Sequence, residues 1–267
     1  MSNCTIIPVP ALQDNYMYLI IDNETQQAAA IDPVDVDAIQ AAALTANATI
    51  TTILTTHNHW DHSGGNLKLI RSTPTIDRVY GGVGDDVPGC THEVTDGSTF
   101  SIGTKTNVSV LFTPCHTQGH VCYYVDNAHV FTGDTLFVSG AGNFNTGTPK
   151  QMTEAFDKIL KLPDSTNVWV GHEYTAKNCA FACYCEPNNK EMKERLEWAK
   201  SRGSIHVGGR GTIPTTIGKE KACNPFARID VLSVMEFCGP CVNVDDERAE
   251  RMRLVRKGKD DWGRRGG

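Results

Sequence analysis

The chain has 267 residues, of which 40% are hydrophobic and 21% are charged, and its formal net charge is −6 at pH 7. This length allows one large α/β domain, or a larger domain with a smaller appendage, and it is enough to bury a full core. The acidic balance argues against a nucleic-acid partner, which normally leaves a basic footprint. No apolar run approaches the ~20 residues that a membrane-spanning helix needs, so we expect no membrane partner.

The N-terminal segment and the cysteines indicate the compartment. Residues 1–20 contain neither a basic segment followed by an apolar one nor a pattern rich in Arg and Ser, so we expect a cytoplasmic protein. The ten cysteines are then expected to be reduced thiols. The sequence CGPC, from Cys238 to Cys241, resembles the redox motif of thioredoxins, but it lies outside any βαβ pattern. Spare thiols or a turn are therefore favoured over a redox role.

Short β-branched and aromatic runs, most of them ending in a polar residue, dominate the first two thirds of the chain. The strands that these runs predict are residues 4–10, 15–22, 28–33, 49–56, 107–114, 121–126, 129–134 and 167–172. Apolar residues at helical spacing predict helices over residues 36–47 and 148–163. The second of these has Pro149 just inside its start and Pro163 at its end, as helix boundaries prefer.

The pattern changes after His172. Residues 173–184 and 189–203 have helical character, and no clear strand follows them. We therefore predict a boundary near residue 173. It separates an α/β domain over residues 1–173 from a mainly helical domain over residues 174–267.

Histidines and aspartates cluster where the predicted strands end. The residues of this type are His57, His59, Asp61, His62, His116, Asp134 and His172. Residues that leave a strand at positions i and i+2 point to the same side, so His57 and His59 can chelate one ion. Asp61 and His62 fall at the entry of the next segment, where a helix can turn them toward a second ion. Gly64 and Gly65 permit that helix to pack closely under the loop.

A solvated loop is the alternative interpretation of HNHWDH, and it would be favoured for a single His or for an HxH pair alone. Three further donors at separate strand ends make a chance arrangement a poor explanation. Seven nitrogen and oxygen donors are enough for two ions with open positions for water, as catalytic sites require. We therefore predict two divalent metal ions. Zinc is expected first, and iron or manganese also suits this ligand set.

Longer motifs carry a family resemblance over essentially the whole chain. THNHWDHSGGN, TPCHTQGHVCYYV, FTGDTLFV and VGHEYT are similar in order and spacing to the metallo-β-lactamase superfamily, and closely to glyoxalase II, the hydroxyacylglutathione hydrolases. NPFARI and MRLVRKGKD resemble the C-terminal helical domain of that family. The metal motif is shared by a large superfamily and specifies fold and ions. The C-terminal motifs support the narrower identification.

The resemblance implies an αββα sandwich, with two metal ions at the edge of its two sheets and a smaller helical C-terminal domain. One ion would be held by His57, His59 and His116, and the other by Asp61, His62 and His172, with Asp134 bridging both. A hydroxide between the ions would attack a thioester carbonyl, with Asp61 orienting it. The expected reaction is hydrolysis of S-D-lactoylglutathione by a monomeric enzyme to glutathione and D-lactate, the second step of methylglyoxal detoxification.

The resemblance also implies a glutathione site, with one departure. Tyr174, Arg256 and Lys259 match glutathione contacts of the family, but a Lys and a Tyr that are usual after GDTLF are replaced by Asn143 and Asn145. Losing a charge-assisted hydrogen bond costs about 1.5–3 kcal/mol, or roughly 10-fold in binding. We therefore expect a high KM with a normal kcat. A different thiol in the substrate is the other interpretation of this loop.

Two further alternatives concern the reaction and the neighbouring residues. A glutathione persulfide dioxygenase would share the fold but use a single iron, which the full two-metal ligand set disfavours. Asp32 is either a hydrogen-bond partner of a ligand histidine or a turn former next to Pro33. His120 is expected to hold the strand entry rather than to bind metal.

Overall fold

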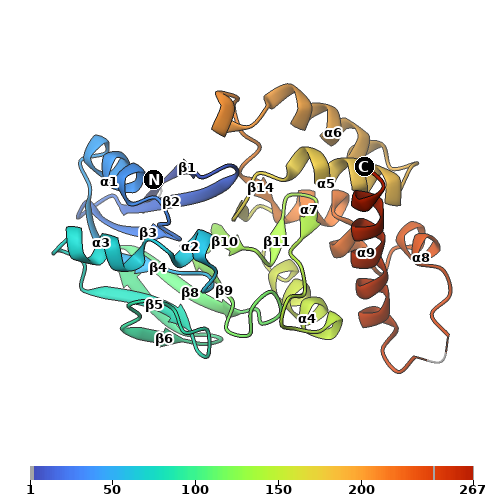
Figure 1. Ribbon diagram of the computed structural model, residues 1–267, viewed down its shortest axis with the longest axis horizontal. Coiled ribbons are helices and arrows are strands. Elements are labelled where there is room, and N and C mark those ends of the chain that lie inside the picture. Colours follow the sequence, from blue (N-terminus) through green and yellow to red (C-terminus); the bar gives the residue numbers. More distant parts are fainter. Residues whose placement is uncertain (1–2, 243, 267) are drawn as a thin grey trace.

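The protein is described by a computed structural model over residues 3–242 and 244–266, and two six-stranded sheets form its centre (Figure 1). The first sheet has the strand order β1-β2-β3-β4-β5-β6. Its strands are β1 (Cys4–Ala11), β2 (Asn15–Asp22), β3 (Gln27–Ile31), β4 (Thr49–Leu54), β5 (Arg78–Gly82) and β6 (His92–Val94). The pairs from β3 to β6 are parallel and the others are antiparallel.

The second sheet has the order β14-β13-β10-β9-β8-β7, and a separate hairpin joins β11 to β12. The strands are β7 (Thr99–Ile102), β8 (Thr106–Phe112), β9 (Val121–Val125), β10 (His129–Gly133), β11 (Leu136–Phe137), β12 (Gly140–Ala141), β13 (Asn167–Val170) and β14 (Thr215–Thr216). In this sheet β10 and β13 are parallel neighbours, with Gly133 opposite Val170. Their carboxyl ends therefore meet at one edge.

Strand β2 shows why the two sheets lie between helices. All eight of its residues are buried, because successive side chains point to opposite faces and both faces are covered. Tyr16, Tyr18 and Ile20 belong to the core between the sheets. Met17, Leu19 and Ile21 belong to a second core with residues of α1 (Val36–Thr45) and α3 (Asn66–Ser72), which cover the outer face in Figure 1. The predicted αββα class is confirmed.

The remaining helices lie at the other end of the molecule from α1 in Figure 1, except for the short α2 (Trp60–Ser63) beside the sheet edge. They are α4 (Pro149–Leu160), α5 (Thr175–Cys185), α6 (Lys190–Arg202), α7 (Ile217–Cys223), α8 (Leu232–Cys238) and α9 (Glu247–Arg264), with the 3₁₀ turns η1 (Ile205–Val207) and η2 (Pro225–Arg228). Thr148 and Gln151 form a capping box at the start of α4, next to Pro149. Within residues 3–242 and 244–266, no helix is both long and apolar enough to cross a bilayer.

The expectation that no strand follows His172 is wrong. Strand β14, Thr215–Thr216, pairs with β13 and forms the edge of the second sheet. A two-residue strand carries no alternating pattern, so its position depends on tertiary contacts that the sequence does not display. Three short strands of the first half, β5, β6 and β7, were also not predicted.

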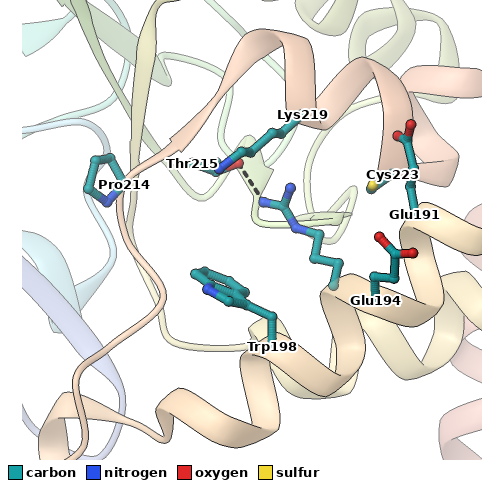
Figure 2. Close-up of a pocket in the computed structure, with 8 residues that line it drawn as sticks. Glu191, Glu194, Trp198, Pro214, Thr215, Lys219 and Cys223 are labelled. Carbon is teal, nitrogen blue, oxygen red and sulfur yellow. Dashed lines mark hydrogen bonds between the residues drawn. The ribbon is translucent and has the colours of Figure 1, made fainter.

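A pocket of about 270 Å³ lies among the C-terminal helices (Figure 2). Trp198 and Glu194 of α6, Pro214, and Lys219 of α7 line it. At its base the buried Arg195 bonds Thr215 and the fully buried Glu220, which accepts a further hydrogen bond from the amide of Ser139. This buried ion pair therefore joins the C-terminal helices to the loop after β11. No residue that the sequence predicts for the site lines this pocket.

The cysteines are free thiols in the structure. Cys238 is the last residue of α8, and Gly239 follows it with a φ of 74°. Burial raises the pKa of the Cys238 thiol to about 11, which disfavours the reactive thiolate form. The first two residues of the CGPC sequence thus form the C-terminal end of α8 and its cap.

Candidate active site

The seven predicted ligand residues lie at one edge of the two sheets, on loops that follow β4, β8, β10 and β13. The loop after β4 turns at once into the short helix α2, which carries Asp61 and His62. Gly65 lies under this loop, where a Cβ atom would collide with the backbone carbonyl of Pro33. This close approach brings the start of α3 against the turn after β3. The local fold thus brings the loop after β4 next to the edge where β10 and β13 end.

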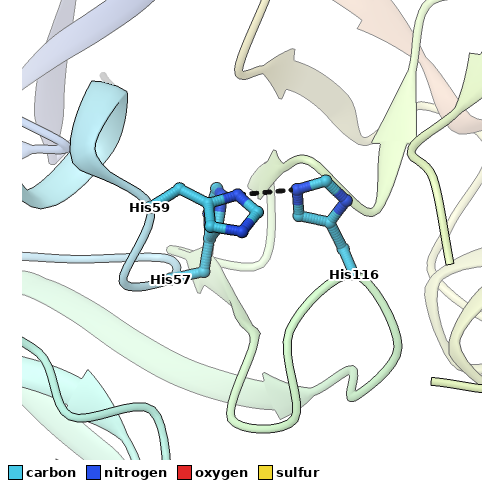
Figure 3. A group of neighbouring side chains, drawn as sticks. All are labelled: His57, His59 and His116. Atoms are coloured by element: carbon cyan, nitrogen blue, oxygen red, sulfur yellow. Dashed lines mark hydrogen bonds between the residues drawn. The ribbon is translucent and has the colours of Figure 1, made fainter. Parts of the chain in front are cut away.

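Three histidines form the first group (Figure 3). His57 Nε2 lies 3.1 Å from His59 Nδ1, and His116 Nε2 lies 3.0 Å from the same His59 nitrogen. The ring nitrogens that point away from this group, the outer nitrogens, form hydrogen bonds. His116 Nδ1 donates to the carbonyl of Asn143 at 2.9 Å, and His57 Nδ1 lies 3.1 Å from the Thr56 hydroxyl. That hydroxyl donates its own proton to a carboxylate at 2.7 Å, so it accepts from His57. The Nε2 atoms of His57 and His116 therefore carry no proton, and each can donate its lone pair to a metal ion.

Asp61, His62 and His172 form the second group. His62 Nε2 and His172 Nε2 lie 3.2 Å apart, and Asp61 Oδ2 lies 3.3 Å from His172 Nε2. Here too the outer nitrogens are held by hydrogen bonds: His62 Nδ1 donates to Asp32 at 3.0 Å and His172 Nδ1 to Asp14 at 2.7 Å. Carboxylates in these positions fix the ring orientation and the tautomer, and they make a ligand nitrogen more basic.

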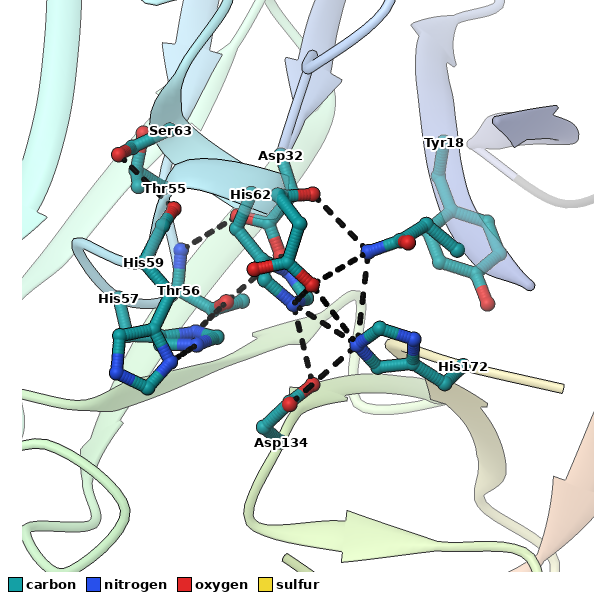
Figure 4. A network of polar contacts seen from close by, with 12 residues as sticks. Tyr18, Asp32, Thr55, Thr56, His57, His59, His62, Ser63, Asp134 and His172 are labelled. Atoms are coloured by element: carbon teal, nitrogen blue, oxygen red, sulfur yellow. Dashed lines mark hydrogen bonds and ion pairs between the residues drawn. The ribbon is translucent and has the colours of Figure 1, made fainter. Parts of the chain in front are cut away.

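Asp134 lies between the two groups, as Figure 4 shows for its side near His62 and His172. Its Oδ1 is 3.3 Å from His62 Nε2, and its Oδ2 is 3.4 Å from His172 Nε2 and 3.5 Å from His116 Nε2. The residue is only 7% exposed. Gly171 lies beside it, and a Cβ atom there would collide with the Asp134 carboxylate. Asp134 can therefore donate an oxygen to each side.

These contacts fit metal ions better than they fit hydrogen bonds. The Nε2 atoms of His62 and His172, whose protons are placed on Nδ1, lie 3.2 Å apart, so their lone pairs converge on a shared point. In the other group the Nε2 atoms of His57 and His116 both lie within 3.1 Å of His59 Nδ1. A tetrahedral ion with nitrogens at about 2.0–2.1 Å separates its ligands by about 3.3 Å. The buried Asp134 Oδ1 accepts no hydrogen bond from any described residue, so it too has a vacancy for a cation. The donor set fits a dinuclear metal centre.

The electrostatics of the buried carboxylate agree with this arrangement. Burial alone raises the pKa of the Asp134 carboxyl, but His62 and His172 outweigh that effect and hold its pKa well below the usual range. Burial likewise raises the pKa of Asp61, but the neighbouring His172 and His62 outweigh that effect and hold its pKa below the usual range. Both carboxylates are therefore ionised and available as ligands.

Three supporting residues were not predicted from the sequence. Asp14 and Asn15 lie at the β1–β2 turn, and the Asn15 amide donates to Asp61 Oδ2 at 3.0 Å. Asp85 accepts hydrogen bonds from the amides of Asn58 at 2.7 Å and Gly119 at 3.0 Å, so one carboxylate steadies both histidine loops. The only available signal was their polarity between apolar runs, which any turn also shows.

The two residues left open by the sequence have defined contacts. Asp32 accepts hydrogen bonds from His62 and from the amide and hydroxyl of Thr56, so it contacts a ligand histidine while also shaping its turn with a φ of 48°. His120 Nε2 accepts a hydrogen bond from the Asp134 amide at 3.2 Å, and its Nδ1 lies 2.9 Å from the Thr113 hydroxyl. Both nitrogens of His120 are engaged, so none is free for a metal.

A pocket of about 610 Å³ opens from the metal centre toward α5 and α9. His116 and Asp134 of the candidate metal site line it. Tyr174, which stacks on His172 at 4.8 Å between ring centroids, lines it too. Arg256 and Lys259 of α9 are also among its lining residues. Catalytic-type groups and cations thus share one cavity.

The two asparagines of the loop after β12 differ in position. Asn143 lines the pocket, and its backbone carbonyl holds the ligand His116. Asn145 is exposed and is not among the residues that line the pocket. The structure thus brings Tyr174, Arg256, Lys259 and Asn143 together around the cavity and places Asn145 outside it.

Comparison with known proteins places this fold and site in a class and then in a family. The model described as the metallo-beta-lactamase superfamily matches residues 21–172, and the model described as hydroxyacylglutathione hydrolase C-terminus matches residues 173–262. A cytoplasmic hydroxyacylglutathione hydrolase of Arabidopsis thaliana is 46% identical over 263 residues, which cover 96% of this chain and 98% of the relative. The chain belongs to the hydroxyacylglutathione hydrolase family of the metallo-β-lactamase superfamily.

Solved structures agree on the fold. ETHE1 from Myxococcus xanthus is 26% identical with a TM-score of 0.65, and the match covers 96% of this chain and 98% of that one. TTHA1623, solved in a di-iron-bound form, is 24% identical with a TM-score of 0.58 and covers 83% of this chain and 99% of its own. The second match bears on the fold alone.

Proposed function

We propose that the protein hydrolyses the thioester of S-(2-hydroxyacyl)glutathiones, such as S-D-lactoylglutathione, to glutathione and a 2-hydroxy acid. One observation carries the proposal: a single cavity joins the dinuclear donor set, at His116 and Asp134, to the cations Arg256 and Lys259. A thioester whose thiol part carries carboxylates would use both features of this cavity. Metal ions would polarise its carbonyl, and the cations would bind its carboxylates. The full-length likeness to a hydroxyacylglutathione hydrolase supports the same substrate.

The roles of the metal-binding residues follow from their geometry. His57, His59 and His116 would hold one ion and Asp61, His62 and His172 the other, with Asp134 shared. Two divalent ions bound there would supply a hydroxide near neutral pH and polarise the thioester carbonyl. Zinc suits this ligand set first, and iron or manganese would also be accepted.

The remaining residues hold the substrate and the attacking water. Asp61, held by Asn15 and 34% exposed at its side chain, faces the open side of the centre and would orient the attacking water. Tyr174 would pack against the substrate beside the ligand His172. Arg256 and Lys259 would bind carboxylate. The thiol of glutathione leaves as a thiolate with little help, because thiols are fairly acidic.

We place the enzyme in the cytoplasm, as the Arabidopsis thaliana relative is named. We propose that it acts as a monomer on a small molecule, without a membrane or nucleic-acid partner. The net charge of −6 supports the last point.

The test is an assay of metal-analysed protein with acyl thioesters of glutathione, coenzyme A and N-acetylcysteamine, followed by the loss of thioester ultraviolet absorbance. We expect turnover of S-D-lactoylglutathione with the highest kcat/KM of the panel. Oxygen uptake with glutathione persulfide, in place of thioester cleavage, would identify a dioxygenase instead. Preference for coenzyme A would overturn the glutathione assignment and leave the metal centre standing.

A further inference from the structure

The cations of the substrate pocket differ in how far they are already engaged. Arg256 Nη2 pairs with Asp260 at 2.7 Å, and its Nη1 donates to the carbonyl of Ala141 at 3.1 Å. The Lys259 ammonium donates to the side-chain carbonyl of Asn178. Both side chains are therefore held in place by the protein before any substrate arrives. They form a fixed anion-binding corner on α9.

Lys177 is a third cation of the same pocket, and it is not engaged. It lies in the first turn of α5, three residues after Tyr174, and it lines the cavity with Arg256 and Lys259. Its ammonium makes no hydrogen bond or ion pair with any residue that the structure describes. It lies close enough to Lys259 for the two positive charges to repel. Arg264 also lines the cavity but pairs with Asp261. Four cations thus line one cavity, and among its described lining residues the acidic ones are Asp260 and Asp134.

Neither Lys177 nor Lys259 forms an ion pair with a described carboxylate, since Lys259 bonds the neutral Asn178. Their positive charges therefore create an electrostatic potential that favours an anionic ligand. The first turn of α5 adds to it, because the positive end of a helix dipole lies there. Glutathione carries two carboxylates, one at its glycine end and one on its γ-glutamyl end. The fixed corner of Arg256 and Lys259 suits one of them, and a second carboxylate needs a cation at a separate place.

We propose that Lys177 binds the second carboxylate of the glutathione moiety and so makes the pocket selective for thiols with two carboxylates. This inference rests on the proposed function. It also assigns a cation to a pocket in which the loop after β12 contributes the uncharged Asn143.

The test compares Lys177→Gln and Lys177→Arg with the unchanged enzyme. For S-D-lactoylglutathione we expect Lys177→Gln to raise KM about 3- to 10-fold, the range for one partly screened charged contact, while kcat stays within about twofold because the group lies away from the reacting atoms. Lys177→Arg keeps the charge and should restore KM. The competitive Ki of S-methylglutathione should rise by the same factor, since it reports binding alone. Lys193→Gln, on the exposed side of α6, removes a charge elsewhere and should change neither value.

Truncated thioesters separate contact from general attraction. S-lactoyl-γ-glutamylcysteine ethylamide lacks the glycine carboxylate, and S-lactoyl-N-acetylcysteinylglycine lacks the γ-glutamyl carboxylate. Lys177→Gln should leave KM unchanged for whichever of the two lacks the carboxylate that Lys177 binds. An unchanged KM for S-D-lactoylglutathione, or an equal rise for both truncated thioesters, would overturn the inference. Absence of any thioester turnover in the unchanged enzyme would instead overturn the proposed function.

Discussion

The metal centre and the substrate pocket share His116 and Asp134, but they are built in opposite ways. At the metal centre the ligand residues follow strand ends, and the outer ring nitrogens of four histidines are fixed by hydrogen bonds. In the pocket the cations come from helices α5 and α9, which only tertiary packing brings near the sheet edge. The metal-binding residues are thus positioned by strand ends and local hydrogen bonds. The residues expected to select the substrate lie on helices that pack against the sheets.

The largest effect is expected from replacing Asp134, one of the two residues that the metal centre and the pocket share. We expect Asp134→Asn to lower kcat/KM by more than about 100-fold, since even residues that only support a ligand change metal affinity or activity by about 10- to 100-fold. The bound metal, measured by mass spectrometry, should fall together with activity. Asp37→Asn, at an exposed ion pair on α1, is the matched control and should change neither. Full metal content with unchanged kcat/KM in Asp134→Asn would show that the carboxylate is not shared by the ions.

A smaller effect is expected at the hydrogen bond that orients a ligand. Asp14→Ala removes the acceptor of His172 Nδ1 and should lower metal affinity about 10-fold, measured by competition with a chelator. Once metal is restored in excess, KM should be unchanged, because Asp14 does not line the pocket. Asp77→Ala, which removes an exposed carboxylate, serves as the control. Unaltered metal affinity in Asp14→Ala would mean that the loop holds His172 without it.

The same division explains what the sequence predicts. His57, His59, Asp61 and His62 are close in the chain, and the strand period alone orients the first two. The predicted strands and helices indicate an α/β domain, and these features depend on local periodicity, which a sequence displays directly. The αββα class came from the family resemblance, and the comparisons confirm it.

Features that depend on packing were missed. Asp14 contacts His172 across 158 positions, and no local pattern marks such a partner. Strand β14 is two residues long, so only its pairing with β13 defines it. Lys177 is an exposed residue of α5, as a helical lysine usually is, and only the tertiary structure makes it line a pocket together with residues of α9.

Substitutions in the loop after β12 test whether binding in the pocket depends on single charges. Asn143→Lys combined with Asn145→Tyr should lower KM for S-D-lactoylglutathione, by up to about 10-fold if one charge-assisted contact is gained. Because Asn143 lines the pocket and Asn145 does not, the lysine alone should give most of the effect. Asn188→Lys adds the same charge on an exposed loop between α5 and α6 and should have none. No fall in KM would show that these positions do not govern glutathione binding.

We expect a pH dependence of binding that arises at Lys259. Burial, followed by the nearby charges of Arg256 and Lys177, lowers the pKa of this ammonium to about 7, against the opposing effect of Asp260. In the free enzyme Lys259 is therefore charged below pH 7 and loses its charge as pH rises through that value. A bound carboxylate favours the charged form, so the complex keeps the proton to a higher pH.

It follows that KM should be lowest below about pH 7 and should rise above it, by at most about 10-fold for each pH unit until the pKa of the complex is reached. The measurement is KM for S-D-lactoylglutathione between pH 6 and 8.5, with kcat recorded separately because the metal centre has its own titration. Lys259→Arg stays charged throughout this range and should flatten the KM profile while leaving the kcat profile in place. A KM that rises equally in both proteins would assign the pH dependence to the metal centre and not to the cations of the pocket.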